Sequence, residues 1–342
     1  MHDFTQSSLK LNLKVLYFFM FESFFNSVVD IYLLSQSLVY EWLLQPIAFK
    51  LGWGGLMEDG YEASGWVVTG IFQVLVMLII FAPIERLRPV ERVTNKKAIY
   101  VDIIYTALHR LGFFRLFFFF LIEPYFDELF GWLHTHGVGT FQLDDLIPGV
   151  TDVGWISFVT YLVVFDFLGY WIHRAQHQWD VWWALHSVHH SQRQMTLWSD
   201  DRGHLLDDVI HSCLFALAAL VIGVEPSQFV GIIVVTKLSE SFQHSNLRLS
   251  FGRFGEYLWV SPRFHRLHHA IGVGHEFKNR VLGGHNFGVL LPCWDVLFGT
   301  ALFEDRYDAT GIRDQVEGGV DYGDGFWSQQ WFGLKRMVKA LS

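Results

Sequence analysis

Three short segments rich in histidine dominate the second half of this 342-residue chain. They are His173-Arg-Ala-Gln-His177, His186-Ser-Val-His189-His190 and His265-Arg-Leu-His268-His269. Of the 17 histidines in the sequence, eleven lie between positions 173 and 269. A single buried histidine is usually a hydrogen-bonded core residue, but three such segments at repeated short spacings are typical of metal ligands.

The spacing within these segments suits ligands that are carried on helices. Two residues four apart, such as His173 and His177, lie on one face of a helix, and so do two residues three apart. The last histidine of an H-x-x-H-H segment is rotated by about 100° from its neighbour and can reach a second ion. Neutral imidazole binds Fe, Zn, Cu and Ni but not Mg or Ca. Eight clustered imidazoles exceed the roughly four to six ligands of one ion, so the sequence predicts two ions close together.

Two other kinds of histidine site fit less well. A haem held by two axial histidines needs only two ligands and leaves the H-x-x-H-H segments unexplained. A zinc protease motif places a glutamate directly after its first histidine, and this chain has Arg174 there. The sequence therefore lacks the general base of that class of protease.

The composition indicates a membrane protein. The chain is 51% hydrophobic, 17% aromatic and only 17% charged, which is too apolar for an ordinary soluble domain. A mean hydropathy of +0.27 suggests a few membrane helices that carry a large part outside the membrane. The net charge of −9 and the lack of basic runs exclude nucleic acid as a partner. The two cysteines, Cys213 and Cys293, form no metal or redox motif.

The apolar stretches predict where the chain crosses the membrane. Residues 15–49 predict one or two helices at or in the membrane, and the uncharged 22-residue stretch 63–84 is long enough to cross it. A second apolar stretch, 98–122, carries charges and predicts a protein-facing or interfacial crossing. Residues 153–172 predict another crossing, and 209–236 predict a helical hairpin that dips into the bilayer and returns.

The distribution of basic residues predicts which side of the membrane holds the histidines. Five Lys and Arg residues lie within 85–97, whereas 123–152 contain six acidic residues and no basic one. By the positive-inside rule, 85–97 are cytosolic and 123–152 lie on the far side. All three histidine segments then reach the cytosolic face, and His134 and His136 lie on the other face.

These observations predict an all-α fold, an integral-membrane helical bundle with a histidine-rich di-metal cap on the cytosolic side. We expect an N-terminal membrane-associated region at 1–62, a membrane-embedded catalytic domain at 63–301 and a soluble C-terminal tail at 302–342. The tail contains Gly-rich turns and a short closing helix.

The histidine segments, in this order and among membrane spans, resemble the fatty acid hydroxylase/sterol desaturase superfamily of integral-membrane di-metal oxygenases. The resemblance covers about 80 to 300 and is specific for the superfamily, but not for a substrate. Further segments that look like those of the family are Pro83-Ile-Glu-Arg-Leu-Arg-Pro89, Asp166-Phe-Leu-Gly-Tyr-Trp-Ile-His173, Arg202-Gly-His204, Gln243-His244-Ser-Asn246, Asn286-Phe-Gly and Trp294-Asp-Val-Leu-Phe-Gly-Thr300.

The resemblance implies a set of metal ligands. Nine are His173, His177, His186, His189, His190, His244, His265, His268 and His269, and His204 is a tenth candidate. His204 is followed by Leu205, where the family often has proline. Asp166 lies on the same helical face as His173 and could orient a ligand imidazole, or it could be an interfacial residue. We interpret His109, His211 and His275 as structural, and His285 as a residue behind the ligands or incidental.

The resemblance also implies the chemistry. Two iron ions, which zinc can replace in isolated protein, would activate O₂ to hydroxylate or desaturate an unactivated C–H bond, and we favour hydroxylation. The substrate would be a lipid or sterol that enters from the bilayer. The sequence has no cytochrome b5-like His-Pro-Gly-Gly segment, flavin motif or ferredoxin cysteine set. A separate electron donor is therefore expected, which could be a ferredoxin, cytochrome b5 or a reductase.

A non-enzymatic membrane metal protein, either a transporter or a zinc-stabilised scaffold, is the alternative. A transporter places ionisable groups along a path at the membrane midplane, often within repeated halves. The chain shows no internal repeat beyond the duplicated H-x-x-H-H segment, and its histidines are expected at one membrane face. This pattern favours the oxygenase.

Overall fold

The computed structural model describes residues 27, 29–139, 141–276 and 282–342. These residues are helical apart from turns, loops and isolated β-bridges, with no β-strand among them. The predicted all-α membrane bundle is therefore confirmed. The chain divides into two compact units, Met1–Ile71 and Phe72–Ser342, which we describe separately.

The first unit contains a helix over 29–39 and the elements that follow it. These elements are η1 (Tyr40–Leu44), α2 (Gln45–Leu51), η2 (Gly54–Leu56) and the first part of α3 (Met57–Val76). The side chain of Gln36 donates a hydrogen bond to the carbonyl of Tyr61 over 3.0 Å and ties the first helix to α3. The helices expected within 15–49 are present from residue 29 onward, and 15–26 lie outside the described residues.

The second unit contains the candidate site. Its elements are η3 (Met77–Phe81), α4 (Ala82–Leu87), α5 (Lys96–Arg110), α6 (Phe113–Leu121), α7 (Glu123–Thr135), η4 (Leu143–Asp145), α8 (Gly154–Gln178), α9 (Asp180–His190), α10 (Leu205–Ile222), α11 (Pro226–Gln243), α12 (Gly252–Gly255), α13 (Pro262–His268), α14 (Cys293–Leu297), α15 (Arg313–Glu317) and α16 (Phe326–Leu341).

Within the described residues, three helices are long and apolar enough to cross a membrane: Gly60–Leu87, Gly154–Gln178 and Leu205–Ile222. The stretch expected to cross at 98–122 is bent instead. The helices Lys96–Arg110 and Phe113–Thr135 meet at an angle of 40° and pass the same test only as a pair. The bend lies at Gly112, whose φ of 92° is a conformation that glycine adopts readily.

Helices α8, α10 and α11 pack around an aromatic core. Tyr161 and Phe165 of α8 are buried beside Ile232 of α11, and the ring of Phe165 lies 5.7 Å from that of Phe215 in α10. The Tyr161 hydroxyl hydrogen-bonds to the carbonyls at the turn between α10 and α11. The sequence breaks there at Gly223 and Pro226, so the expected helical hairpin is present.

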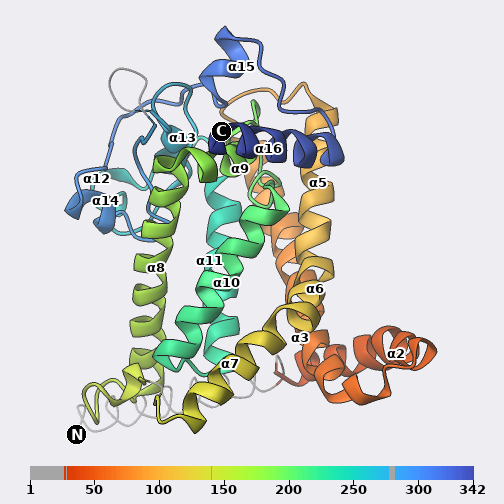
Figure 1. Cartoon of the computed structure of the whole chain (residues 1–342). Coiled ribbons are helices and arrows are strands. Elements are labelled where there is room, and N and C mark those ends of the chain that lie inside the picture. Colours follow the sequence, from red (N-terminus) through yellow and green to blue (C-terminus); the bar gives the residue numbers. More distant parts are fainter. Residues whose placement is uncertain (1–26, 28, 140, 277–281) are drawn as a thin grey trace, which may run out of the picture. The chain divides into compact units, whose positions relative to one another are not determined.

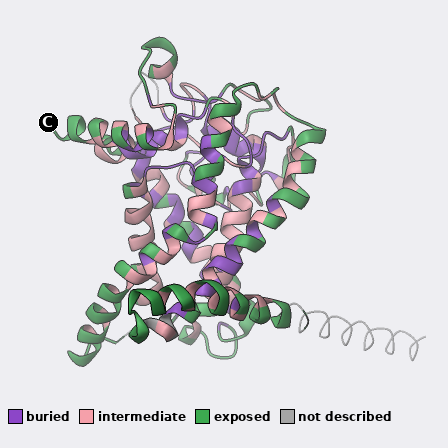
Figure 2. Cartoon of the chain, turned by 90° about the vertical axis from the view of Figure 1, so that its right-hand side faces the viewer, coloured by how far each residue is buried: buried purple, intermediate pink, exposed green. Residues whose placement is uncertain are grey.

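Three further helices lie at one end of this bundle. Helices α9, α13 and α16 lie together there, whereas α7 lies at the opposite end (Figure 1). Helix α16 packs against α9, so the C-terminal helix contacts the helix that bears three of the predicted ligands. Buried residues gather at the same end (Figure 2).

Buried ion pairs fix the loop between α9 and α10. Arg110 of α5 pairs with Asp200 over 2.6 Å and with Asp201 over 2.8 Å. Arg202 pairs with Asp102 over 2.7 Å. Breaking a buried pair typically costs about 3–5 kcal/mol, because it leaves an uncompensated charge. The loop is therefore held firmly beside α5.

Candidate metal centre

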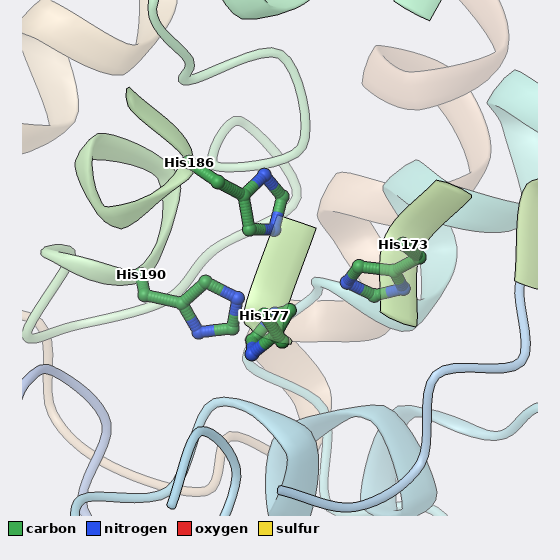
Figure 3. A group of neighbouring side chains, drawn as sticks. All are labelled: His173, His177, His186 and His190. Carbon is green, nitrogen blue, oxygen red and sulfur yellow. The ribbon is translucent and has the colours of Figure 1, made fainter. Parts of the chain in front are cut away.

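The structure brings nine of the ten predicted ligands together. The first set consists of His173 and His177 from α8 and His186 and His190 from α9, and one nitrogen of each lies within 4.8 Å of the others. Figure 3 shows these four side chains as neighbours from two helices. The α8 pair shares a face because its members are four residues apart, and the α9 pair is related in the same way.

A second set lies beside the first. It consists of His189, His244, His265 and His269, from α9, the end of α11, and α13 with its C-cap. Their Nε2 atoms follow one another at 3.1 Å from His189 to His244, 3.0 Å from His244 to His265, and 3.2 Å from His265 to His269. His265 and His269 of the third histidine segment thus belong to a different set from the two histidines of the first segment.

The ninth histidine, His268, lies between the two sets. It groups with His190 and His269, and its ring centroid lies 4.4 Å from that of His173. The two sets therefore adjoin and share a boundary, as expected for two ions held close together.

Backbone carbonyls orient several of these rings. Each carbonyl accepts a hydrogen bond from an Nδ1–H over 2.7–2.9 Å, which leaves the Nε2 lone pair free for a ligand bond. The pairs are His173 with Phe287, His189 with Arg202, His244 with Glu240, and His268 with His285.

The contact between His189 and His244 tests whether the residues fit a metal. Both rings carry their proton on Nδ1, so two lone pairs face each other over 3.1 Å with no hydrogen between them. This arrangement is repulsive without a cation. Neighbouring nitrogens that each lie about 2.1 Å from one ion are separated by about 3.0–3.4 Å, depending on the geometry. The separations in the second set match that range, and the residues therefore fit a metal ion.

The first set fits for a related reason. His177 and His190 are buried, and neither ring nitrogen of either residue has a hydrogen-bond partner within the described residues. Buried polar atoms are rarely left unpaired in folded proteins, because the loss of hydration costs free energy. A bound cation would satisfy these nitrogens.

Burial also keeps the histidines of the cap in their ligating form. Burial, reinforced by neighbouring imidazoles, lowers the pKa well below the ordinary value of 6.5 for His189, His190, His265, His268 and His269. A neutral imidazole has a lone pair for the metal, whereas a protonated one does not. The cap is thus arranged to bind a cation at neutral pH.

This lowering of pKa predicts a pH-dependent stability of the metal-free protein. The unfolded chain takes up protons on these histidines as the pH falls below about 6.5, whereas the folded cap resists protonation until lower pH. The free energy of unfolding is therefore expected to fall as the pH drops below that value. Thermal unfolding of metal-free protein checks this, and an unfolding temperature that does not change between about pH 7 and pH 5 would contradict it.

Asp207 contacts a predicted ligand, although no motif in the sequence pointed to it. Its carboxylate accepts a hydrogen bond from His186 Nδ1 over 3.0 Å, and further ones from Gln176 Nε2 and Trp182 Nε1. The tripeptide Arg202-Gly-His204 lies shortly before it, but the bond to His186 joins two helices and has no local signal. A carboxylate that binds a ligand imidazole fixes the ring and raises its basicity.

Asp166, the residue considered for this role, has other partners. Its carboxylate accepts hydrogen bonds from the backbone N–H groups of Leu290 and Leu291 and from the indole of Trp294. It therefore anchors the loop before α14 and does not bind a ligand ring directly.

The same loop positions the carbonyl of Phe287, which accepts the hydrogen bond from His173 Nδ1. Asp295 accepts hydrogen bonds from the N–H groups of Phe287 and Gly288 over 2.8 and 2.7 Å. Asn286, with a φ of 62°, donates hydrogen bonds to the carbonyls of Phe264 and Leu302. The segments Asn286-Phe-Gly and Trp294-Asp thus act together to hold one ligand.

His204, the tenth candidate, is not part of the cluster. Its Nε2–H donates to the carbonyl of Gln330 over 2.9 Å, and its Nδ1 accepts from the N–H of Leu206 over 3.1 Å. Both nitrogens are therefore occupied, and we leave His204 out of the proposed ligand set. Its ring packs against Gly333, where an added Cβ would lie 2.4 Å from His204 Cδ2.

This contact predicts that His204 holds α16 in place rather than a metal. We expect His204→Ala to retain the metal content of the wild type while hydrogen exchange in α16 becomes faster, because the bond to Gln330 is lost. Metal analysis combined with hydrogen-exchange mass spectrometry checks both parts. Loss of metal with unchanged exchange in α16 would instead make His204 a ligand.

The remaining histidines of the described residues lie outside the two sets. His109 bonds to Asp208 and to the Tyr105 carbonyl, and the ring of His211 stacks on Phe215 at 4.5 Å. His275 is buried against Trp183, and His285 contributes its carbonyl to His268. His134 lies in α7, at the end of the bundle opposite the metal centre (Figure 1).

Comparison with known proteins points to one family. Residues 158–300, which span both sets, match the model of the fatty acid hydroxylase family. An ornithine lipid hydroxylase of Rhizobium tropici is 28% identical over 151 residues, which are 44% of this chain and 43% of that protein. Human alkylglycerol monooxygenase is 28% identical over 165 residues, 48% of this chain and 35% of that protein.

A Delta(7)-sterol 5(6)-desaturase of Gibberella zeae is 25% identical over 128 residues, 36% of this chain and 39% of that protein. The matches thus span less than half the length of each of these relatives. No solved structure matches the chain. The family model that matches residues 158–300 and these relatives support the assignment of the chain to the fatty acid hydroxylase/sterol desaturase superfamily.

Proposed function

We propose that the protein is a multi-pass membrane oxidoreductase that uses two iron ions, O₂ and external electrons to oxidise an unactivated C–H bond of a lipid or sterol. Hydroxylation is the reaction we favour, with desaturation as the alternative outcome at the same centre. The names of the relatives, which include lipid hydroxylases, a monooxygenase and a sterol desaturase, support this proposal.

The contact between His189 and His244 carries the proposal. Within a cluster of nine histidines, the Nε2 lone pairs of these two rings face each other with no hydrogen between them. Two adjoining sets of neutral nitrogen ligands suit two transition-metal ions, and they suit neither Mg nor Ca. We propose as ligands His173, His177, His186, His189, His190, His244, His265, His268 and His269.

The iron pair, when bound, supplies the reduction of O₂ and the oxidation of the C–H bond. The protein holds the ligand rings and keeps water away. Phe287 is fully buried, with its ring 5.2 Å from His177 and 5.7 Å from His268. Trp183 lies 5.0 Å from His177. These aromatic walls exclude solvent, which would otherwise react with oxidising species.

We further propose that the metal centre faces the cytosol and that the electrons come from a separate ferredoxin, cytochrome b5 or reductase. The five basic residues of 85–97 support this orientation, because basic residues accumulate on the cytosolic side. Arg86, Arg92 and Lys97 among them are exposed.

The test uses the full chain in lipid nanodiscs, loaded with ferrous iron, supplied with a chemical reductant and exposed to ¹⁸O₂. Mass spectrometry of the lipids distinguishes the two reactions, since hydroxylation adds one labelled oxygen atom and desaturation removes two hydrogens without adding oxygen. A variant with His268→Ala and His269→Ala serves as the control and should yield neither product.

Metal analysis of gently purified protein decides between the proposal and its alternative. Two iron ions per chain that are lost in the His268→Ala/His269→Ala variant support the oxygenase. One tightly held zinc ion in a protein that forms no O₂-dependent product would contradict it, and would favour a zinc-stabilised scaffold or transporter.

A further inference from the structure

An open apolar groove lies between α8, α9 and α10, and α16 contributes one residue to it. Its volume is about 570 Å³, within the range of about 300–1,000 Å³ that is typical of small-molecule sites. None of the described residues that line it is charged. The lining residues are Trp171, Ile172, Ala175, Trp179, Val181, Trp182, Leu185, Ile210, Leu214 and Met337.

The groove opens on a face that the membrane would cover. Helix α10 is apolar enough to cross a bilayer, yet only 6% of its most apolar stretch is buried inside the structure, against 39% for α8. Leu217 and Val221 continue the exposed apolar surface of α10 from Leu214 toward its C-terminal end. The groove is therefore reached from the hydrocarbon region rather than from water.

Its inner wall adjoins the metal centre. Ile172 and Leu185 are buried in that wall, and each directly precedes a proposed ligand, His173 or His186. Trp182, also in the wall, donates its indole N–H to Asp207, the carboxylate that holds His186. A molecule in the groove therefore lies beside the first set of histidines.

The tryptophans indicate the depth at which the groove lies in the membrane. Trp179 stands between α8 and α9 with an exposed fraction of 62%, and Trp171 is 41% exposed. Tryptophan is enriched where the bilayer meets water, because its ring is apolar and its N–H is polar. The groove thus reaches from this interface toward the apolar surface of α10.

We propose that the groove binds the hydrocarbon chain of a membrane lipid and presents it to the metal centre. A polar ligand would lose its hydration there without gaining hydrogen bonds, because the lining side chains are apolar. A flexible hydrocarbon chain meets no such penalty. This assignment rests on the proposed function only in treating the bound lipid as the substrate.

The test maps lipid contacts in metal-free protein, so it does not depend on turnover. The full chain is placed in phosphatidylcholine nanodiscs that contain a trace of phosphatidylcholine with a photoactivatable diazirine in its acyl chain. After illumination, mass spectrometry locates the adducts. We expect adducts around Trp171 and Leu214 to exceed those around Val221 several-fold.

Two matched variants make the test specific. Leu214→Trp fills the groove from α10 and should abolish the excess labelling, whereas Leu217→Trp places the same side chain three residues further along α10, outside the lining, and should leave it intact. Equal labelling at Trp171 and Val221, or labelling unaffected by Leu214→Trp, would overturn the proposal. Cross-links between two protein chains at the groove would also overturn it, since a second copy would then be the occupant.

Turnover separates this proposal from the proposed function. With iron loaded, Leu214→Trp should lower kcat/KM for lipid oxidation several-fold while its iron content stays that of the wild type. If the wild type showed groove labelling but formed no oxidised lipid, the lipid-binding groove would be supported and the enzymatic role would be contradicted. If Leu214→Trp formed oxidised lipid as well as the wild type does, the enzymatic role would be supported and the groove would not be the substrate site.

Discussion

His186→Ala is expected to remove one of the two metal ions and to leave the other in place. His186 belongs only to the first set of histidines, so its loss leaves that ion with too few ligands. His265 belongs only to the second set, and His265→Ala should remove the other ion for the same reason. Metal analysis of the two single variants and of the double variant, which should bind neither ion, measures this directly.

The control for these variants is His211→Ala. His211 lies in the same part of the chain but stacks on Phe215 and belongs to neither set, so its removal should preserve both ions. If His186→Ala and His265→Ala each removed all metal, the two groups would not be separable ion sites. If neither removed any, the cluster would not be the metal centre.

Asp207→Asn is expected to weaken the first ion site by about 10- to 100-fold, the usual cost of losing the carboxylate behind a ligand histidine. Among the proposed ligands, within the described residues, His186 alone donates a hydrogen bond to a carboxylate. Asparagine keeps the size of the side chain but removes the negative charge that the Nδ1–H of His186 faces. Competition with a chelator of known affinity gives the change for each ion.

Asp208→Asn provides the matched comparison. Asp208 is the next residue in α10, and its carboxylate bonds to His109, which is not a proposed ligand. This substitution should leave both affinities unchanged. If both variants weakened metal binding equally, the effect would come from the overall charge of α10, and a specific role of Asp207 would be contradicted. The second ion should keep its wild-type affinity in Asp207→Asn.

The nine clustered histidines could be predicted because either their spacing along the chain or a family motif identifies them. Spacings of three and four residues on a helix bring His173 and His177 to one face whatever the remainder of the fold does. His244 has no such neighbour and was found only through the resemblance to the superfamily. The long uncharged stretches that become membrane helices are equally local signals.

The contacts that the sequence did not reveal join distant segments. His204 resembles a ligand in its tripeptide, but Gln330, far along the chain, takes up its Nε2–H. Asp166 stands on the same face as His173, yet its carboxylate turns to Leu290 and Trp294. Asp207 approaches His186 only because α10 packs against α9. Helical periodicity gives the face of a residue and not its partner on another element.

The second set of histidines joins segments that are far apart in the chain, since His189 and His265 are separated by about 75 residues that include α10 and α11. A bound ion would therefore act as a cross-link. An ion that binds the folded chain and not the unfolded one stabilises the fold by its binding free energy, because the site is lost when the chain unfolds. Helices α8 and α10 can enter the bilayer before any ion binds, because their apolar length alone allows it. Iron starvation should thus shorten the lifetime of the protein in the cell, because α9 and α13 are then no longer linked by an ion and become accessible to proteases.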